Sequence, residues 1–527
     1  MPISFTFKHN FMVTIRTLPF IFALLFLWHT EAVSQDAIPR GFDTFVEQGL
    51  DEWNIPGIAI GIVKDGEILF TGGFGVRKQS EPHPVDEQTQ FGIASVSKNM
   101  TAVAIGMLVD QGILDWDDRV IDHLPWFRLS DTYATEQATI RDLLTHQVGV
   151  GRMLGNRLQF MTNHPTQELL HHMRHHEFEQ PFRQQYVYSN MMYAAAGEIV
   201  AAASGLEFGE YIERRLFEPL GMSRTVPSIT RLDESNAAWP HQEIEGEVVE
   251  IPRRNWDNAT PAGGVNSTVA DMAKWMNFYL GTTGEWNGKR LVRPETMREI
   301  QTPKVSLPTN SITGAQVSYG YGLRITDYRG RRLLSHGGAT DGMNTIFMLM
   351  PEEELGIIVI TNTFSSFQQA VAYTLIDHFI GEEATDWNQI FKSQYDQRYR
   401  NAMEQRQAFE STRVMGTSAS RPLDDYAGFY DDDLYGTMRI SLNGETLRLT
   451  AWNDETLTAT LEHWHYDTFR IVWDNPALRE EFVRFHHALE GHIDSMTIRY
   501  TLRPLMLQVG AYPTNYYRDV RFQKIAR

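Results

Sequence analysis

The chain has 527 residues, with 47 Lys and Arg against 66 Asp and Glu, a formal net charge of −19, and no cysteine. The missing cysteine excludes a disulfide framework, a thiolate nucleophile and any cysteine-ligated zinc or iron–sulfur site. The acidic charge disfavours nucleic acid and anionic lipid as main partners, because both need a basic footprint. With 42% hydrophobic residues, the chain can bury large cores, and its length suggests two to four domains.

Residues 1–34 carry the pattern of a secretory signal peptide. Lys8 and Arg16 precede a short apolar run at 18–28, and Ala32-Val33-Ser34 provides small residues where a signal peptidase cleaves. The run is shorter than the roughly 20 apolar residues that a membrane span needs. We therefore expect export to a secreted or periplasmic location, with no stable membrane span. A retained N-terminal anchor is the alternative.

Residues 35–385 have the pattern of one α+β domain. Two β-rich runs at 57–76 flank the turn sequence KDGE, which is a hairpin signal. An amphipathic helix is predicted at 97–110 and a second helix at 191–203. Four strand-like runs lie between 305 and 362, namely YGYGLRI, RRLLSHGG, NTIFMLMP and LGIIVITN, before a closing helix near 367–380. Strands from both ends, with helices between them, predict one antiparallel sheet flanked by helices and an inserted helical lobe.

The first motif with catalytic chemistry is Ser95-Val96-Ser97-Lys98, at the start of the first of these helices. The spacing puts Ser95 and Lys98 on one helical face, so the amine can approach the hydroxyl. The positive end of the helix favours a developing alkoxide and a neutral amine. A serine needs such a partner, because its free hydroxyl is a weak nucleophile at neutral pH. The S-x-x-K pattern alone is common in proteins and is not specific.

The second motif is Tyr188-Ser189-Asn190, just before the second helix. A tyrosine beside a lysine can share the proton of the serine and return it to a leaving group. The asparagine amide can contact both the lysine and a substrate carbonyl. A helix N-cap, with Ser189 or Asn190 accepting backbone N–H groups, is the alternative.

The third motif is His336-Gly337-Gly338, followed by Ala339, on a predicted inner strand. The two glycines let a substrate backbone lie against the strand edge. The backbone N–H groups of Ala339 and Ser95 can then form an oxyanion hole. A turn is the alternative for His-Gly-Gly.

The sequence pattern changes at about residue 386 and again at about residue 421. A polar, Gln- and Arg-rich stretch at 388–413 predicts a linker helix within residues 386–420. Short alternating strands then fill residues 421–527, with an Asn443-Gly444 turn between two of them. Several short strands at regular spacing predict a small sandwich or barrel.

In their order and spacing the three motifs resemble S-x-x-K, Y-x-N and K-T-G of the serine β-lactamase and penicillin-binding superfamily. The class C β-lactamase-related branch, which includes D-Ala-D-Ala carboxypeptidase B, is the more similar one. The resemblance spans residues 40–385 and includes the phrases TIRDLLTH at 139–146, PLGM at 219–222 and PAGGVNST at 261–268. The segment at 422–440 and the phrase LEHWHYDTF resemble the lipocalin-like barrel module of some peptidases and esterases of this branch. The implied fold is therefore a β-lactamase/transpeptidase-like α+β domain followed by a small all-β lipocalin-like barrel.

The resemblance implies a role for each motif residue. Ser95 is the acyl-enzyme nucleophile, and Lys98 and Tyr188 are the proton-handling pair, either of which is a candidate base. The implied substrate-binding residues are Asn190, His336, Gly337 and Gly338. The implied oxyanion donors are the N–H groups of Ser95 and Ala339. No metal and no cofactor is expected.

One departure from the family pattern narrows the range of expected substrates. Where β-lactamases have a lysine in the third motif, this chain has His336, which is largely neutral at pH 7 when unperturbed. A permanent cation there helps to hold a penicillin-type carboxylate, so its loss disfavours a dedicated β-lactamase. The leading hypothesis is an exported serine hydrolase that cleaves peptide or other amide bonds, with small esters as further substrates. The alternatives are a carboxylesterase or weak β-lactamase of the same family, and a penicillin-binding sensor that holds the acyl-enzyme.

The expected partner is thus a small peptide, amide or ester. In relatives the barrel module packs near the catalytic mouth or mediates assembly, so we also expect either that contact or a homo-oligomer.

Three other patterns have simpler interpretations. The histidines at 171, 172, 175 and 176 have metal-ligand spacing but lack the glutamate of H-E-x-x-H, which favours a solvated or pocket-rim helix. The aspartates at 431–433 fit a solvated turn, and His463 and His465 fit barrel packing.

Overall fold

The computed structural model describes residue 1, residues 38–151, residues 163–501 apart from 245, 282, 453 and 479, and residues 517–526. Residues Pro39–Arg527 form one compact unit, which holds both domains described below. The expected signal peptide lies outside the described residues, so export stays a prediction. Within the described ranges, no helix is both long enough and apolar enough to cross a membrane.

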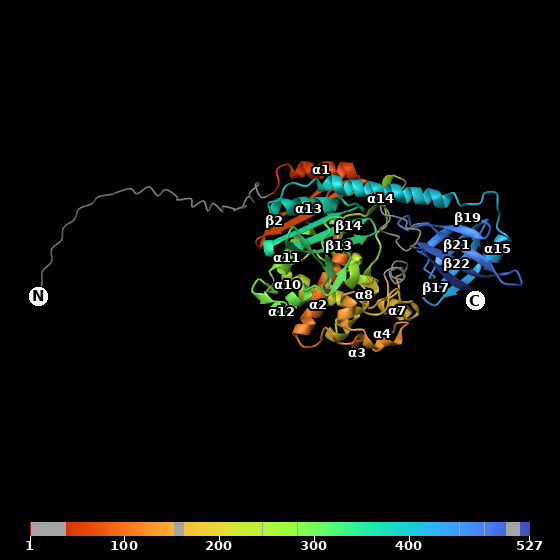
Figure 1. Cartoon of the computed structure of the whole chain (residues 1–527), viewed down its shortest axis with the longest axis horizontal. Coiled ribbons are helices and arrows are strands. Elements are labelled where there is room, and N and C mark those ends of the chain that lie inside the picture. Colours follow the sequence, from red (N-terminus) through yellow and green to blue (C-terminus); the bar gives the residue numbers. More distant parts are fainter. Residues whose placement is uncertain are drawn as a thin grey trace. The chain divides into compact units, whose positions relative to one another are not determined.

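A nine-stranded antiparallel sheet forms the centre of the first domain (Figure 1). Its order is β10-β11-β12-β13-β14-β15-β1-β2-β3. The predicted hairpin is confirmed as β1 (Gly57–Lys64) and β2 (Glu67–Lys78). β1 also pairs with β15 (Leu355–Thr361), with Ile60 opposite Val359, so strands from both ends of the domain share one sheet as the sequence predicts. The other strands are β3 (Glu81–Pro84), β10 (Val305–Leu307), β11 (Val317–Tyr319), β12 (Arg324–Tyr328), β13 (Arg331–Thr340) and β14 (Met343–Met350).

The run YGYGLRI is not the single strand that its composition suggests. β11 ends at Tyr319 and β12 begins at Arg324, with a turn between them. In that turn Gly322 has φ +77, and a Cβ on it would lie 2.7 Å from the carbonyl oxygen of Lys98. A glycine is needed there because the turn passes directly against the helix that carries Lys98.

Helices cover both faces of the sheet. α1 (Phe42–Trp53) and α13 (Phe367–Phe379) lie on one face, and α11 (Val269–Leu280) lies on the other (Figure 1). Next to α11 is a helical lobe built around α2 (Ser97–Asp110) and α8 (Asn190–Ser204). The remaining helices are α3 (Val120–His123), α4 (Thr132–Gln137), α5 (Ile140–Leu144), α7 (Thr166–His172), α9 (Phe208–Ile212), α10 (Glu218–Leu220) and α12 (Pro294–Ile300).

The expectation that α2 is amphipathic is wrong. Every residue from Ser97 to Leu108 is buried, including Lys98, Asn99 and Thr101. α2 runs through the interior of the lobe and packs against α8 and α12, so it has no solvent-facing side over those residues. The polar residues are satisfied inside: the Thr101 hydroxyl donates to the Pro261 carbonyl at 2.7 Å, and the Trp275 indole donates to Asn99 at 3.0 Å.

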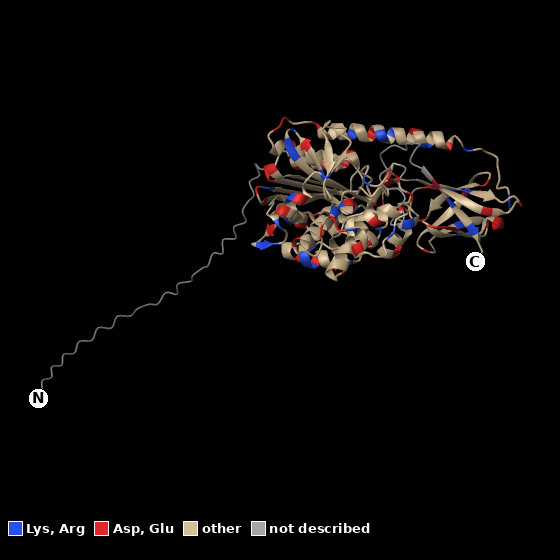
Figure 2. Cartoon of the chain, turned by 60° about the horizontal axis from the view of Figure 1, so that its bottom comes forward, with Lys and Arg blue, Asp and Glu red and all other residues tan. Residues whose placement is uncertain are grey.

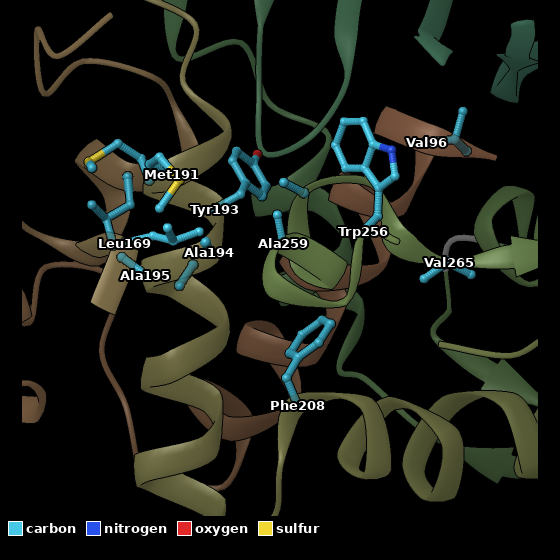
Figure 3. Packing of buried hydrophobic residues seen from close by; sticks show 14 of the residues in the cluster. Val96, Leu169, Met191, Tyr193, Ala194, Ala195, Phe208, Trp256, Ala259 and Val265 are labelled. Carbon is cyan, nitrogen blue, oxygen red and sulfur yellow. The ribbon is translucent and has the colours of Figure 1, made fainter. Parts of the chain in front are cut away.

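The hydrophobic core of the lobe supports the strands and helices that carry the motifs. Figure 3 shows side chains from α7, α8 and the segment that follows Trp256 packed together. Ala259 lies near the middle of this packing, and Val96 and Val265 lie beyond Trp256. The α7 and α8 members labelled there are Leu169, Met191, Tyr193, Ala194 and Ala195. This core fixes the start of α8 relative to the start of α2.

Two short paired strands and two small hairpins complete the first domain. β4 (Phe91–Gly92) pairs with β7 (Asn266–Ser267), which places the chain just before Ser95. The hairpins are β5 (His241–Ile244) with β6 (Glu247–Glu250), and β8 (Glu285–Trp286) with β9 (Lys289–Arg290).

A helix occupies the stretch in which the sequence predicts a linker helix. α14 (Trp387–Glu410) begins after Asp386, whose carboxylate accepts the Gln389 N–H at 2.9 Å. Acidic and basic residues are interspersed along it (Figure 2). Aromatic residues nevertheless anchor both ends: the Trp387 ring lies 4.8 Å from Tyr373 of α13, and the Phe409 ring stacks on Trp464 of the second domain at 6.0 Å.

The second domain is a closed eight-stranded barrel. A short helix, α15 (Leu423–Tyr426), precedes it. Its strands are β16 (Gly428–Asp432), β17 (Gly436–Asn443), β18 (Thr446–Ala451), β19 (Thr458–His465), β20 (Thr468–Trp473), β21 (Glu481–His487), β22 (Ile493–Thr501) and β23 (Tyr517–Ile525). β23 pairs with β16 and closes the ring. Buried aromatic pairs pack in it, such as Tyr430 with Phe485 and Tyr435 with Tyr500. The predicted fold class is therefore confirmed for both domains.

Candidate active site

Ser95 lies in a short 3₁₀ turn, Ala94–Val96, between β4 and α2. Ala94 has φ 48, a left-handed conformation that is unusual for a residue with a side chain. The Ser97 hydroxyl donates to the Ala94 carbonyl at 2.7 Å and holds this turn. The half-buried Ser95 is thus presented at the N-terminal end of α2, where the helix dipole favours negative charge.

Lys98 is fully buried, and its amine reaches the nucleophile. Its Nζ lies 3.2 Å from Ser95 Oγ. The same atom donates at 2.7 Å to Asn190 Oδ1 and at 2.7 Å to the carbonyl oxygen of Ala262. Since a buried amine costs free energy unless its hydrogens are bonded, these two acceptors are what hold Lys98 beside Ser95.

Tyr188 completes the contacts of the serine. Its Oη lies 2.8 Å from Ser95 Oγ, and Lys98 Nζ lies 4.7 Å from the centre of its ring. Asn190 is the first residue of α8 and is buried. The preceding Ser189 makes no side-chain capping bond, so the N-cap interpretation does not describe this triplet. The first two motifs, 90 residues apart in sequence, therefore meet at one oxygen atom.

His336 of the third motif is a buried, neutral side chain. Its Nδ1 lies 2.7 Å from the Gly337 carbonyl, which only accepts, so Nδ1 carries the hydrogen. Its Nε2 then accepts from the Tyr319 hydroxyl at 3.1 Å. Burial, together with the Lys98 ammonium, lowers the pKa of His336 to about 3. Burial also raises the pKa of Tyr319 well above its ordinary value, which keeps that hydroxyl protonated.

The third motif lies on β13 and not in a turn. β12 pairs with β13 only as far as Ser335, opposite Arg324, so the edge from His336 to Thr340 extends beyond β12. Gly337 is exposed on this stretch, whereas a Cβ on Gly338 would lie only 2.3 Å from the Ile93 carbonyl oxygen. β13 therefore runs against the chain just before Ser95, and Ala339 follows at that point. An uncovered strand edge next to a nucleophile is the arrangement in which a substrate backbone can add as a further strand.

The four histidines of the middle lobe do not share a helical face. α7 ends at His172 and a 3₁₀ turn follows, which breaks the spacing on which a metal site would depend. The His171 ring packs 5.2 Å from Trp126, and His172 Nδ1 lies 3.0 Å from the Asp433 carbonyl oxygen. Across the residues that the structure describes, no group of three or more His, Asp or Glu side chains could hold a metal ion.

The other patterns in the second domain serve its structure. The Asp432 carboxylate accepts the N–H groups of Leu434 and Tyr435, which shapes the turn after β16. His465 Nδ1 accepts the Val414 N–H at 3.2 Å, which joins the segment after α14 to the barrel.

Sequence reasoning missed three partners of the site. The Ala262 carbonyl holds Lys98, whereas the sequence phrase that contains Ala262 indicates only a family resemblance. Tyr193, whose ring lies 5.3 Å from Lys98 Nζ, follows Asn190 by three residues and could have been placed on the same face of α8. His146 lies behind Tyr188, with ring centres 4.4 Å apart. No local pattern indicates that contact, because 42 residues separate the two.

Comparisons with known proteins give matches to both domains of the chain. A family model described as "Beta-lactamase" matches residues 42–379, and one described as "Domain of unknown function (DUF3471)" matches residues 412–524. The unguisins hydrolase ungD of Aspergillus violaceofuscus is 25% identical over 478 residues, which cover 81% of this chain and 82% of that protein. Protein flp of Staphylococcus aureus is 27% identical over 337 residues, 62% of this chain and 63% of that protein.

Among solved structures, the octameric penicillin-binding protein homologue from Pyrococcus abyssi is similar over nearly its whole length. The TM-score is 0.59 with 22% sequence identity, and the match covers 92% of this chain and 99% of that one. At this identity the likeness concerns the fold alone.

Proposed function

Because the chain belongs to the β-lactamase family, we propose that it is a serine hydrolase that cleaves peptide or other amide bonds, and small esters, through an acyl-enzyme on Ser95. The observation that carries this proposal is the convergence of Tyr188 Oη and Lys98 Nζ on Ser95 Oγ, at 2.8 and 3.2 Å. A serine hydroxyl between two proton carriers at hydrogen-bond distance is an activated nucleophile. The name of the unguisins hydrolase supports hydrolysis as the reaction class.

Tyr188 is the better placed of the two candidate bases. Its oxygen is the nearer one to Ser95, whereas Lys98 donates at 2.7 Å to Asn190 and to Ala262, two acceptors that hold an ammonium. In the proposed step, Tyr188 reacts as the phenolate, next to the Lys98 ammonium. Ser95 Oγ attacks the substrate carbonyl carbon while its proton passes to the phenolate oxygen of Tyr188. Tyr188 then returns that proton to the leaving amine or alcohol as the scissile bond breaks. Water hydrolyses the acyl-enzyme and restores Ser95.

The third motif favours a substrate whose binding does not depend on a carboxylate group. His336 is neutral, so it supplies no cation for the acid group of a penicillin-type substrate. The uncovered edge of β13 suits an extended acyl chain, and the N–H groups of Ser95 and Ala339 are the proposed donors to the substrate oxygen. These features favour linear amides and esters over β-lactams.

The experiment is a hydrolysis panel on the purified chain and on Ser95→Ala. The panel holds D- and L-aminoacyl amides, linear peptides, p-nitrophenyl esters and a cephalosporin. Removal of a catalytic serine lowers kcat by several orders of magnitude, on the order of 10⁶ in a well-studied serine protease. A matched control is Ser80→Ala, an exposed serine between β2 and β3. Hydrolysis that survives Ser95→Ala contradicts the proposal.

A pulse of labelled penicillin separates turnover from sensing. The hydrolase proposal expects either no label on Ser95 or rapid loss of the label. A label that persists for hours would instead favour the penicillin-binding sensor.

We also propose export and self-assembly. The basic residues, the apolar run at 18–28 and Ala32-Val33-Ser34 support an exported protein, and mass spectrometry of the mature N-terminus tests it. A mature protein that keeps Met1 would contradict cleavage. The octameric neighbour supports a homo-oligomer, to which the C-terminal barrel is the proposed contributor, and light scattering of the purified chain measures the assembly.

A further inference from the structure

His146 is a buried histidine directly behind the proposed proton carrier. It follows α5, is fully buried and has φ 60, again in the left-handed region. Its ring lies among four tyrosine rings, with centre-to-centre distances between 4.4 and 5.3 Å. The four are Tyr186, Tyr188, Tyr193 and Tyr319. None of the three motifs includes His146.

His146 accepts hydrogen bonds from the residues on both sides of Tyr188. The Val187 N–H donates to the His146 carbonyl oxygen at 2.8 Å. The Ser189 N–H donates to His146 Nδ1 at 3.1 Å. One residue therefore fixes the backbone on both sides of Tyr188, while its ring supports the tyrosine ring from behind. Main chain and side chain act on the same three-residue segment.

The bond from Ser189 defines the chemical state of the imidazole. A backbone N–H can only donate, so Nδ1 must be unprotonated and the single hydrogen must be on Nε2. The titratable groups that face this ring are the four tyrosines, and behind the rings of Tyr188 and Tyr193 lies the Lys98 amine. A neutral ring adds no charge beside that amine, whereas an imidazolium would present an N–H to the Ser189 N–H.

We propose that His146 is the positioning residue of Tyr188: it holds the phenol oxygen within hydrogen-bond distance of Ser95 and thereby sets the rate of acylation. This inference rests on the proposed function, since it assigns the support of the same site. Displacing a reacting group by about 1 Å can lower a rate about 100-fold. His146 contributes through Tyr188 and makes no contact with the substrate in this mechanism.

The test compares His146→Asn with His146→Gly. Both residues tolerate a left-handed backbone, so neither variant adds strain. Asn can still accept the Ser189 N–H through Oδ1, whereas Gly cannot. The readout is the second-order rate of Ser95 labelling by a fluorophosphonate. We expect His146→Gly to label about 10 to 100 times more slowly than wild type, and His146→Asn to recover most of that loss.

A double-mutant cycle separates positioning from general stability. In a Tyr188→Phe background the phenol oxygen is already absent, so His146→Gly should lower the labelling rate less than about threefold further. The matched control is His241→Asn. His241 is another fully buried histidine and lies outside the three motifs, and its Nε2 accepts the Gln79 N–H at 3.0 Å. It should leave the labelling rate unchanged.

The possible outcomes distinguish failure of this inference from failure of the proposed function. Equal losses from His146→Gly in both backgrounds, or no loss in either, overturn the inference alone. A wild-type chain that is not labelled at Ser95 overturns the proposed function and this inference with it. If His146→Gly does not fold, ¹⁵N NMR of the wild-type ring remains: the Nε2–H tautomer supports the inference, and an Nδ1–H tautomer overturns it.

Discussion

Gly338 is the residue at which β13 comes closest to the turn that carries the nucleophile. A Cβ there would lie 2.3 Å from the carbonyl oxygen of Ile93 and 3.2 Å from its carbonyl carbon. Favourable C···O contacts begin near roughly 3.3 Å, so Gly338→Ala must push the strand and the turn apart by about 1 Å. The Ile93 atoms belong to the backbone, and the third contact is the Cβ of Thr345 at 3.2 Å, which side-chain rotation does not move.

The separation has two measurable consequences. Overpacking of this kind costs roughly 1–3 kcal/mol of unfolding free energy. It also moves the Ala339 N–H away from the Ser95 N–H, and loss of one oxyanion donor lowers kcat by roughly 10²- to 10³-fold. We therefore expect Gly338→Ala to lower both the urea midpoint and the kcat for a p-nitrophenyl ester, the latter by about 100-fold.

The neighbouring glycine is the matched control. A Cβ on Gly337 would meet only the Thr345 carbonyl oxygen, at 3.8 Å, an ordinary contact. Gly337→Ala should therefore change the unfolding free energy by less than about 0.5 kcal/mol and the ester rate only a few-fold. If the two alanine variants have the same stability and the same rate, the close approach of β13 to the nucleophile turn is refuted.

Three further predictions follow from buried and titratable groups. Asp377→Ala should lower the unfolding free energy by about 2–4 kcal/mol, because its carboxylate is buried and accepts the Trp387 indole N–H at 2.7 Å; a loss below about 1 kcal/mol in urea titration would contradict it. The His336 imidazole should stay neutral down to about pH 4, since its pKa is about 3; NMR that shows titration near the ordinary value of about 6.5 would disprove its burial. Burial raises the pKa of Asp467, but hydrogen bonds from Tyr426 and others outweigh this and lower it to about 2. The stability that Asp467 contributes is thus present above its unfolded pKa near 3.9 and lost as the pH falls towards 2. Calorimetry should show a smaller loss of Tm between pH 4 and 2 for Asp467→Asn than for wild type; equal losses would argue against the shift.

The parts of the fold that follow local rules could be predicted from the sequence. The hairpin at Lys64–Glu67 follows from a turn signal between two apolar runs. Short alternating strands at regular spacing predict a small sandwich or barrel, and the resemblance to the lipocalin-like module implies the barrel that the structure has. The order of motifs predicts that Ser95, Lys98 and Tyr188 meet, and Lys98 Nζ and Tyr188 Oη lie 3.2 and 2.8 Å from Ser95 Oγ.

What could not be predicted depends on contacts between distant segments. α2 has apolar residues at helical spacing, but its burial on every side follows from the helices that surround it, which no periodicity records. The break after Tyr319 arises because Gly322 must pass the carbonyl of Lys98, more than 200 residues earlier. His146 is a similar case, since a single histidine gives no sign of which backbone its nitrogen will bind.

The strained residues of the site argue that it is preorganised. Ala94 and His146 both have left-handed backbones, which cost roughly 1–2 kcal/mol each for residues with a side chain. One precedes the nucleophile, and the other supports the tyrosine that bonds to it. Each is held by a bond to its own carbonyl, from the Ser97 hydroxyl at 2.7 Å and from the Val187 N–H at 2.8 Å. Strain that persists in this way keeps Ser95 and Tyr188 in one geometry before any substrate binds. Selection among substrates then falls to the exposed edge of β13, where Gly337 leaves space beside the fixed site.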